Sequence, residues 1–242
     1  MMRTKIVTAI IIEIAYALFS RTWLRQHAQG VELELLISVL RIATIAVYWR
    51  LFRDLILSRP RPHAGSLRHP LVLAGTAAAL LIPFLFRGWS PGGGIGTAIV
   101  FALTSVIVGV REELLYRAVL FNLLEPRVGL IGTVVISTFL FVVYHYGALP
   151  IAPRVIAEVA IMSIVLGLIY ARTGSLLGVI ALHAVYDGIW FFGPYLNPPL
   201  PDAWRPVFLL TALVLVCMWL WRIGLPSPVG QPRSLRSVDT AR

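Results

Sequence analysis

Residues 96–124 read GTAIVFALTSVIVGVREELLYRAVLFNLL, an apolar run whose second half carries two adjacent carboxylates and two arginines. As a helix this run is ~43 Å long, more than the ~30 Å hydrocarbon core of a bilayer. An ionisable group at bilayer depth costs about 2.5–3.5 kcal/mol on insertion scales. A membrane helix that keeps several such groups is therefore predicted to carry a functional site.

Further apolar runs lie on both sides of this segment. Each is close to the length of a membrane span, about 17–25 residues, and they occupy 6–22, 31–49, 70–87, 128–146, 152–171, 175–192 and 204–222. The chain is 58% hydrophobic, whereas soluble domains are about 45–50% apolar. We therefore predict an all-α polytopic membrane protein with about eight transmembrane helices.

The domain organisation follows from the same pattern. Residues 1–225 are predicted to form a single transmembrane domain, because no stretch resembles a separate soluble domain. Residues 226–242 are rich in Pro, Ser and Arg, a composition typical of disorder. We expect them to form a disordered cytoplasmic tail.

The charge pattern excludes one class of partner and predicts a topology. The formal net charge of +10 would suit nucleic acid, but the arginines lie in short links between apolar runs, as positive-inside loops do. With alternating spans, most of the 21 Lys and Arg residues fall on one side, so both termini are expected to be cytoplasmic. The single cysteine, Cys217, excludes an intrachain disulfide.

Three of the apolar runs carry pairs of side chains four residues apart, which share one face of a helix. The pairs are Glu113 with Arg117, Phe141 with His145, and His183 with Asp187. Glu112 lies about 100° around the helix axis from Glu113. One carboxylate is therefore available for chemistry, while the other is expected to pair with Arg117 and offset the cost of its own burial.

Axial distances place two of these groups at similar depth. If the chain reverses at Glu125–Val128 and the two helices run antiparallel, Glu112 lies ~18 Å and His145 ~24 Å along the helices from the turn. We therefore expect Glu112 and His145 to lie near each other.

A carboxylate and two imidazoles in an apolar pocket suit the activation of water, because the carboxylate can act as a base and an imidazole can stabilise an oxyanion. The same three residues, Glu112, His145 and His183, could instead bind zinc, although the sequence has no HExxH motif. A third interpretation is a proton-coupled transporter, since intramembrane Glu, His and Asp side chains also form proton relays.

The three motifs EELLYR at 112–117, FVVYH at 141–145 and HAVYD at 183–187 resemble, in this order, those of the CAAX protease and bacteriocin-processing family. That family includes the Ras-converting CAAX endopeptidases. The segment TGSL at 173–176 is also similar to the family, and the resemblance covers residues 96–192.

The resemblance implies an eight-helix intramembrane endopeptidase of the glutamate type. It implies that Glu112 activates water, that His145 assists, and that His183 and Asp187 orient the water or support the oxyanion. Many members have Asn at the last position. An ionised Asp is a poor oxyanion donor, so Asp187 is expected to orient His183 or to be protonated.

The remaining expectations concern supporting groups and partners. Glu113 and Arg117 are expected to form a buried ion pair, and Phe141 to pack beside the site. No cofactor is expected, with zinc as the alternative. The resemblance implies a membrane-anchored peptide or protein as substrate, either CAAX-like, a bacteriocin or a sorting tail, and the bilayer as environment. We expect an integral protein of the bacterial inner membrane.

Overall fold

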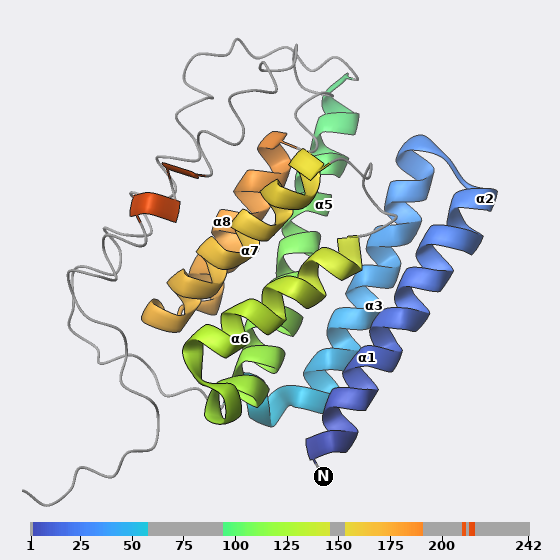
Figure 1. The fold of residues 1–242 in the computed structure, drawn as a ribbon. Helices are drawn as coiled ribbons and strands as arrows, with labels where there is room; N and C mark the ends of the chain where they lie inside the picture. Colours follow the sequence, from blue (N-terminus) through green and yellow to red (C-terminus); the bar gives the residue numbers. More distant parts are fainter. Residues whose placement is uncertain (1, 58–93, 146–152, 191–209, 212, 216–242) are drawn as a thin grey trace, which may run out of the picture.

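The computed structural model describes residues 2–57, 94–145, 153–190, 210–211 and 213–215 (Figure 1). Every named element within these ranges is a helix: α1 (Met2–Leu18), η1 (Phe19–Leu24), α2 (Arg25–His27), α3 (Gly30–Leu57), α5 (Gly94–Glu113), η2 (Leu114–Phe121), α6 (Asn122–His145), α7 (Pro153–Thr173) and α8 (Leu176–Trp190). The all-α class is therefore confirmed for the described part of the chain.

The predicted count of eight spans is not reproduced by these residues alone. The run at 70–87, most of the run at 204–222, and the predicted tail at 226–242 lie outside the described residues. Within the described part, three helical stretches are long and apolar enough to cross a membrane: Thr4–His27, Gly94–His145 and Val155–Thr173. A shorter apolar helix covers Leu176–Gly188.

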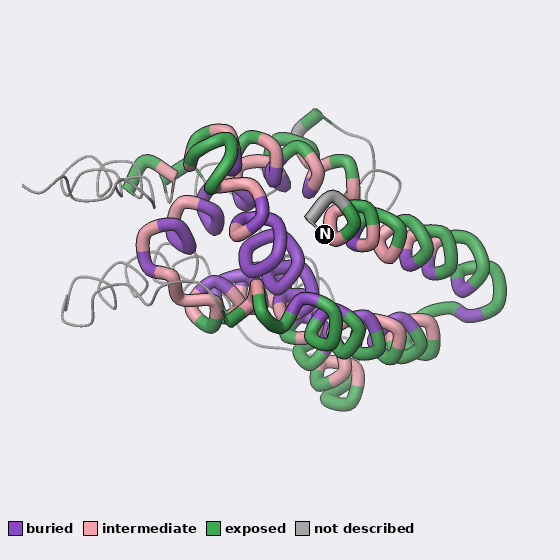
Figure 2. Tube along the Cα trace, turned by 90° about the horizontal axis from the view of Figure 1, so that it is seen from below, coloured by how far each residue is buried: buried purple, intermediate pink, exposed green. Residues whose placement is uncertain are grey.

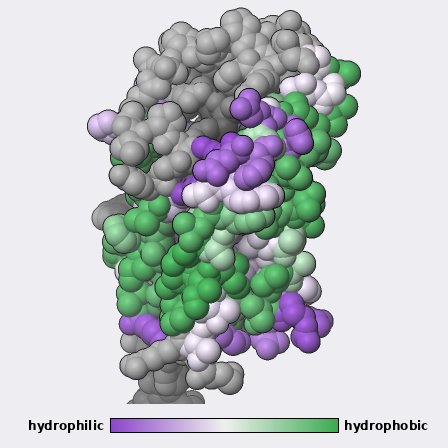
Figure 3. All heavy atoms as spheres, turned by 90° about the vertical axis from the view of Figure 1, so that its right-hand side faces the viewer, coloured by the Kyte–Doolittle hydropathy of each residue, from purple (hydrophilic) through white to green (hydrophobic). Residues whose placement is uncertain are grey.

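The surface of the molecule suits a lipid environment. Figure 3 shows an apolar band across the middle of the face formed by α1 and α3, with hydrophilic residues gathered near its two ends. On α1 and α3, side chains such as Ile11, Leu18, Val39 and Ile42 are more than half exposed. Exposed apolar patches of this extent are rare on soluble monomers and mark contact with lipid or protein.

Helix α5 lies between two helical pairs (Figure 1). The α7–α8 pair covers one side and the α1–α3 pair covers the other, while α6 crosses in front. Burial is concentrated where α5, η2 and α6 meet α7 and α8, and the outer faces of α1 and α3 are mostly exposed (Figure 2). The charged motifs of α5 therefore lie in the interior of the bundle.

The reversal between α5 and the second half of α6 occurs at Gly129. Its φ of 69° interrupts an otherwise helical segment, and residues with a side chain rarely adopt this conformation. The prediction of a turn at Glu125–Val128 was wrong by a short distance, because these residues are still helical. The reversal itself is present, and it returns α6 past η2 and across the front of α5 toward His145 (Figure 1).

The turn between α7 and α8 explains the TGSL segment. Gly174 has a φ of 63°, and its N–H donates to the carbonyl of Tyr170 at 2.8 Å, which ends α7 with a left-handed cap. Ser175 then caps α8, because its hydroxyl accepts a hydrogen bond from the N–H of Gly178 at 3.0 Å. Because only these two capping residues separate α7 from α8, the two helices are close neighbours in the bundle.

Helices α5 and α8 approach each other closely at Gly109. A β-carbon at this position would lie 3.1 Å from the carbonyl oxygen of Ile180 and 3.2 Å from the nitrogen of Ala184. Small residues allow this backbone approach in membrane bundles. Gly109 lies about one turn before the paired glutamates, and Ala184 follows His183. This close contact between α5 and α8 therefore sets the distance between the motif at 112–117 and the motif at 183–187.

Candidate active site

The three motifs meet around the carboxylate of Glu112, at the end of α5. Its Oε2 atom lies 3.8 Å from Nε2 of His145 on α6 and 3.8 Å from Nε2 of His183 on α8. This oxygen is buried and has no hydrogen-bond partner among the described residues. At 3.8 Å neither contact is a direct hydrogen bond. The polar atoms of the three side chains thus face one another without bonding directly.

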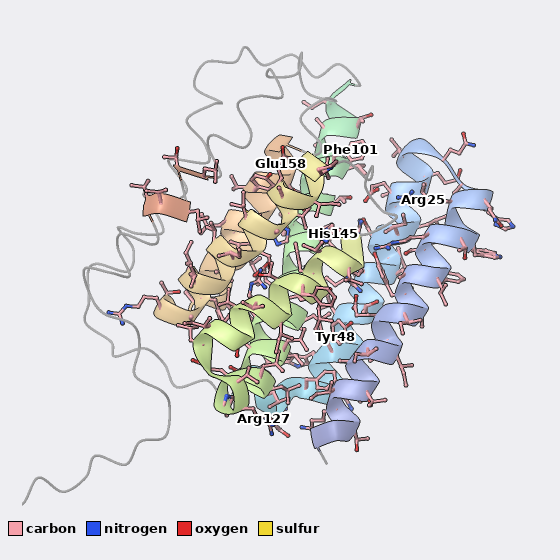
Figure 4. All side chains as sticks on the ribbon, in the orientation of Figure 1. Arg25, Tyr48, Phe101, Arg127, His145 and Glu158 are labelled. Carbon is pink, nitrogen blue, oxygen red and sulfur yellow. The ribbon has the colours of Figure 1, made fainter. Side chains whose placement is uncertain are left out.

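The second nitrogen of each imidazole is held by another group. Nδ1 of His145 lies 2.8 Å from the backbone carbonyl of Phe141. Because a carbonyl only accepts, Nδ1 carries the proton, and in the neutral ring Nε2 is the acceptor. Nδ1 of His183 lies 2.8 Å from Oε1 of Glu113, so this ring also presents Nε2 to Glu112. Figure 4 shows His145 near the end of α6.

Glu113 contacts two partners with its two oxygens. Besides the hydrogen bond from His183, its Oε2 lies 3.0 Å from Nε of Arg117, and both of these side chains are fully buried. Arg117 also donates to the carbonyl of Ser163 at 3.2 Å and lies 3.3 Å from its hydroxyl. Thr138 in turn donates to that hydroxyl at 3.2 Å. The predicted ion pair is present and is part of a larger network that joins α6 and α7 to α5.

Asp187 lies on the opposite side of His183 from Glu113. Its Oδ2 is 3.5 Å from Nε2 of His183, a longer contact than the one that Glu113 makes with Nδ1. Among the described groups, the short hydrogen bond of His183 is therefore the one that its Nδ1–H donates to Glu113. Asp187 faces the same nitrogen as Glu112 does.

Phe141 packs between the two imidazoles. Its ring centroid lies 4.4 Å from that of His145 and 6.1 Å from that of His183, and its backbone carbonyl accepts the hydrogen bond from His145. Tyr116 contacts the same ring edge-on at 4.9 Å. The packing role predicted for Phe141 is thus combined with a backbone contact that fixes His145.

The segment that carries these groups has a recognisable sequence. Residues 94–189 match the family model described as type II CAAX prenyl endopeptidase Rce1-like. This segment belongs to the Rce1-like family. The match confirms the family resemblance of the three motifs. No curated protein and no solved structure matches the chain.

The match of this segment has two consequences. The Rce1-like family points to a protease, a hydrolase whose substrates are membrane-associated proteins or peptides. Together with its apolar helices, the family match identifies the chain as an integral membrane protein. Every predicted site residue, from Glu112 to Asp187, falls within the Rce1-like segment.

The π-helical segment η2 follows the two glutamates directly. Leu114–Phe121 form a π-helix in which all eight residues are buried. Such wide turns are rare and often occur at functional sites. In the Rce1-like segment the change of helix type begins immediately after Glu113, so the two adjacent carboxylates lie at the junction of two helix geometries.

Two features of the site were not predicted from the sequence. Ser163 and Thr138 are neutral side chains within apolar helices, so nothing in their spacing indicates that they contact Arg117. The hydrogen bond between Glu113 and His183 was also missed, because it joins two helices whose relative rotation has no local signal. The buried arginine was the one signal available, since such a cation requires several acceptors.

Proposed function

We propose that the chain is an intramembrane endopeptidase that hydrolyses a peptide bond of a membrane-associated substrate, using water activated by Glu112. The observation that carries this proposal is the position of Glu112 Oε2, which faces Nε2 of His145 and of His183 at 3.8 Å each. Polar contacts beyond 3.5 Å are those that a water molecule can bridge. A bridging water here would touch a carboxylate and two imidazoles.

Glu112 and one water molecule are sufficient for the proton transfers of the hydrolysis. Glu112 takes a proton from the water, and the resulting hydroxide attacks the carbonyl carbon of the scissile bond. The carbonyl oxygen becomes an oxyanion. When the tetrahedral intermediate collapses, the C–N bond breaks and Glu112 returns the proton to the leaving amine, so the carboxylate is regenerated.

The histidines and Asp187 have distinct proposed roles. Nδ1 of His145 is held by the Phe141 carbonyl, so its Nε2 can position the water as a neutral acceptor or, once protonated, donate to the oxyanion. His183 is held by Glu113, so its Nε2 is directed toward the water, where a protonated ring would donate to the oxyanion. A protonated Asp187 would add a second donor near His183.

The zinc alternative would use Glu112, His145 and His183 as ligands. Two ligand atoms of a tetrahedral zinc ion, each about 2.0–2.1 Å from the metal, are roughly 3.4 Å apart, whereas Glu112 Oε2 is 3.8 Å from each imidazole nitrogen. Within the described residues, no group of three His, Cys, Asp or Glu side chains is arranged to hold a metal ion. We propose the mechanism without zinc, and chelation of the purified protein distinguishes it from a zinc site at these three residues.

The finer topology is also part of this proposal. We propose about eight spans, one transmembrane domain over residues 1–225, a disordered cytoplasmic tail, and a bacterial inner membrane with both termini cytoplasmic. The support is the arginine-rich links of the sequence. Fusions of a periplasm-activated phosphatase after successive spans test it. Phosphatase activity of a fusion at the C-terminus would contradict the cytoplasmic placement.

The central experiment is a cleavage assay with purified protein in lipid nanodiscs. The substrates are fluorogenic peptides tethered to lipid, with a CAAX-like C-terminus, a bacteriocin-like leader or a sorting-tail sequence. We expect Glu112→Gln to lower kcat by roughly a hundredfold or more, because the base is lost. Glu32→Gln, which alters an exposed carboxylate of α3, is the matched control.

Three outcomes discriminate between the mechanisms. Cleavage that survives Glu112→Gln contradicts the glutamate mechanism. Cleavage abolished by a strong chelator and restored by zinc supports the metalloprotease instead. An absence of cleavage, together with proton flux into liposomes that is lost in the same variant, supports the transporter.

A further inference from the structure

A second buried polar cluster lies directly beside the proposed catalytic centre. It consists of Glu13 and Tyr16 on α1, Tyr48 on α3, Arg111 on α5 and Tyr144 on α6, and we call it the Arg111 cluster. Its central guanidinium is 1% exposed. The proposed hydrolysis uses none of these groups, although Arg111 and Tyr144 each immediately precede a site residue.

Arg111 is held from three helices. Its NH2 atom lies 2.5 Å from Oε1 of Glu13, and its NH1 atom donates to the hydroxyl of Tyr144 at 3.0 Å. Tyr48 donates to the same oxygen of Glu13. The ring of Tyr16 lies under the guanidinium at 3.7 Å, a distance that favours a cation–π interaction. These contacts connect α1, α3 and α6 to one residue of α5.

A second arginine fixes the end of α6. Arg21, in η1, donates to the backbone carbonyl of Tyr144, and its guanidinium carbon lies 5.0 Å from the ring of the same residue. The last four carbonyls of a helix have no intrahelical partner, and Tyr144 lies in the last turn of α6. Tyr144 is therefore bound by its hydroxyl to Arg111 and by its carbonyl to Arg21.

These contacts determine how α5 and α6 are rotated about their own axes. Adjacent residues of a helix point about 100° apart, so fixing Arg111 also fixes the direction of Glu112, and fixing Tyr144 fixes that of His145. The bond from Arg111 to Tyr144 joins the two helices at these neighbouring positions. Rotation of either helix about its axis would therefore change this bond and the approach of Glu112 to His145 together.

We propose that α1 and η1, which lie outside the Rce1-like segment at 94–189, act as a positioning element for the site through Glu13 and Arg21. Glu13 holds Arg111 and Arg21 holds Tyr144, and together they maintain the approach of Glu112 to His145. The consequence for catalysis rests on the proposed peptidase function. The consequence for the geometry of His145 does not depend on it.

The test uses the full chain in lipid nanodiscs, with Glu13→Gln, Arg21→Gln and Tyr144→Phe. Matched controls are Glu32→Gln, an exposed carboxylate of α3, and Thr8→Val, whose hydroxyl donates within α1 to the carbonyl of Thr4. Two readouts are taken: kcat and KM on the lipid-tethered peptide, and the ¹⁵N signals of His145 and His183 by NMR.

We expect each of the three variants to lower kcat by roughly tenfold to a hundredfold, which is the effect of misplacing a reacting group by about 1 Å. KM should change by less than about twofold, since ground-state binding is not altered. The signals of His145 should shift while those of Nδ1 of His183, bound to Glu113, stay in place. Glu13→Gln and Tyr144→Phe combined should cost little more than either alone, because both act through Arg111.

Unchanged His145 signals in Glu13→Gln and Tyr144→Phe would overturn the proposal, whatever the activity. So would a loss of kcat in which the signals of both histidines move together, since that indicates general unfolding. If the wild-type protein cleaves no peptide, the peptidase proposal fails while the histidine signals still decide whether α1 positions His145.

Discussion

Glu113 accepts a hydrogen bond from Nδ1 of His183 at 2.8 Å across the interface between α5 and α8. Its second oxygen lies 3.0 Å from Nε of Arg117 on the neighbouring turn. One carboxylate therefore orients an imidazole and neutralises a fully buried guanidinium. The two roles have different consequences when the charge is removed, so substitution can separate them.

Replacing Glu113 by Gln should destabilise the protein by about 3–5 kcal/mol, because it leaves the cation of Arg117 buried and uncompensated. Adding Arg117→Met removes that cation and should restore most of the thermal stability. It should not restore peptide cleavage, since His183 still lacks its carboxylate. Thermal unfolding in detergent and the cleavage assay measure the two effects. A double variant as active as the wild type would show that Glu113 serves stability alone.

Asp187 should tolerate the exchange of carboxylate for amide. Asp187→Asn keeps the size of the side chain near Nε2 of His183 and supplies an N–H donor, so we expect kcat within about threefold of the wild type. Asp187→Ala removes the donor and should cost roughly a hundredfold. Steady-state kinetics of the two variants decide the matter. If Asn and Ala are equally impaired, the negative charge itself is required.

Gly109 and Gly96 should respond oppositely to the same substitution. Gly109→Ala places a methyl group 3.1–3.2 Å from backbone atoms of α8, and this overpacking should cost about 1–3 kcal/mol. At Gly96, also in α5, a β-carbon would have no described atom within 4 Å, so Gly96→Ala should stabilise the helix by about 0.5–1 kcal/mol. Unfolding midpoints in the same detergent compare the pair, and equal shifts would contradict the close packing.

The cap at the start of α8 gives a prediction on stability. Ser175→Ala removes the hydroxyl that accepts the N–H of Gly178 and should cost about 1 kcal/mol. Ser175→Asp retains an acceptor at the same place and should preserve stability. Thermal unfolding distinguishes the two. A neutral effect of Ala would mean that α8 is fixed by packing rather than by its cap.

Local pattern was sufficient for the helical class and for contacts within one helix. Spacing of four residues predicted the ion pair of Glu113 with Arg117, which the structure contains. Counting residues from the turn placed Glu112 and His145 at similar depth, and their side chains approach to 3.8 Å. The first result depends on helical periodicity alone, and the second on helical rise together with the reversal of the chain between the two helices.

Contacts between helices could not be predicted in the same way. Glu13 and Arg111 are 98 residues apart, and no periodicity connects them. The pairing of Glu113 with His183 depends on the rotation of α8 about its axis, which the small side chains at the α5–α8 interface control. Rotation is a property of packing, so the sequence supplied the charged groups but not their partners.

The ion pair between Glu13 and Arg111 has a consequence for synthesis. At about 5–20 residues per second, the 98 residues that separate them take roughly 5–20 s to translate. During that interval α1 carries a carboxylate whose cation does not yet exist. The ion pair therefore forms only after α5 has emerged from the ribosome, whereas the hydrogen bond from Tyr48 of α3 to Glu13 has both of its partners earlier.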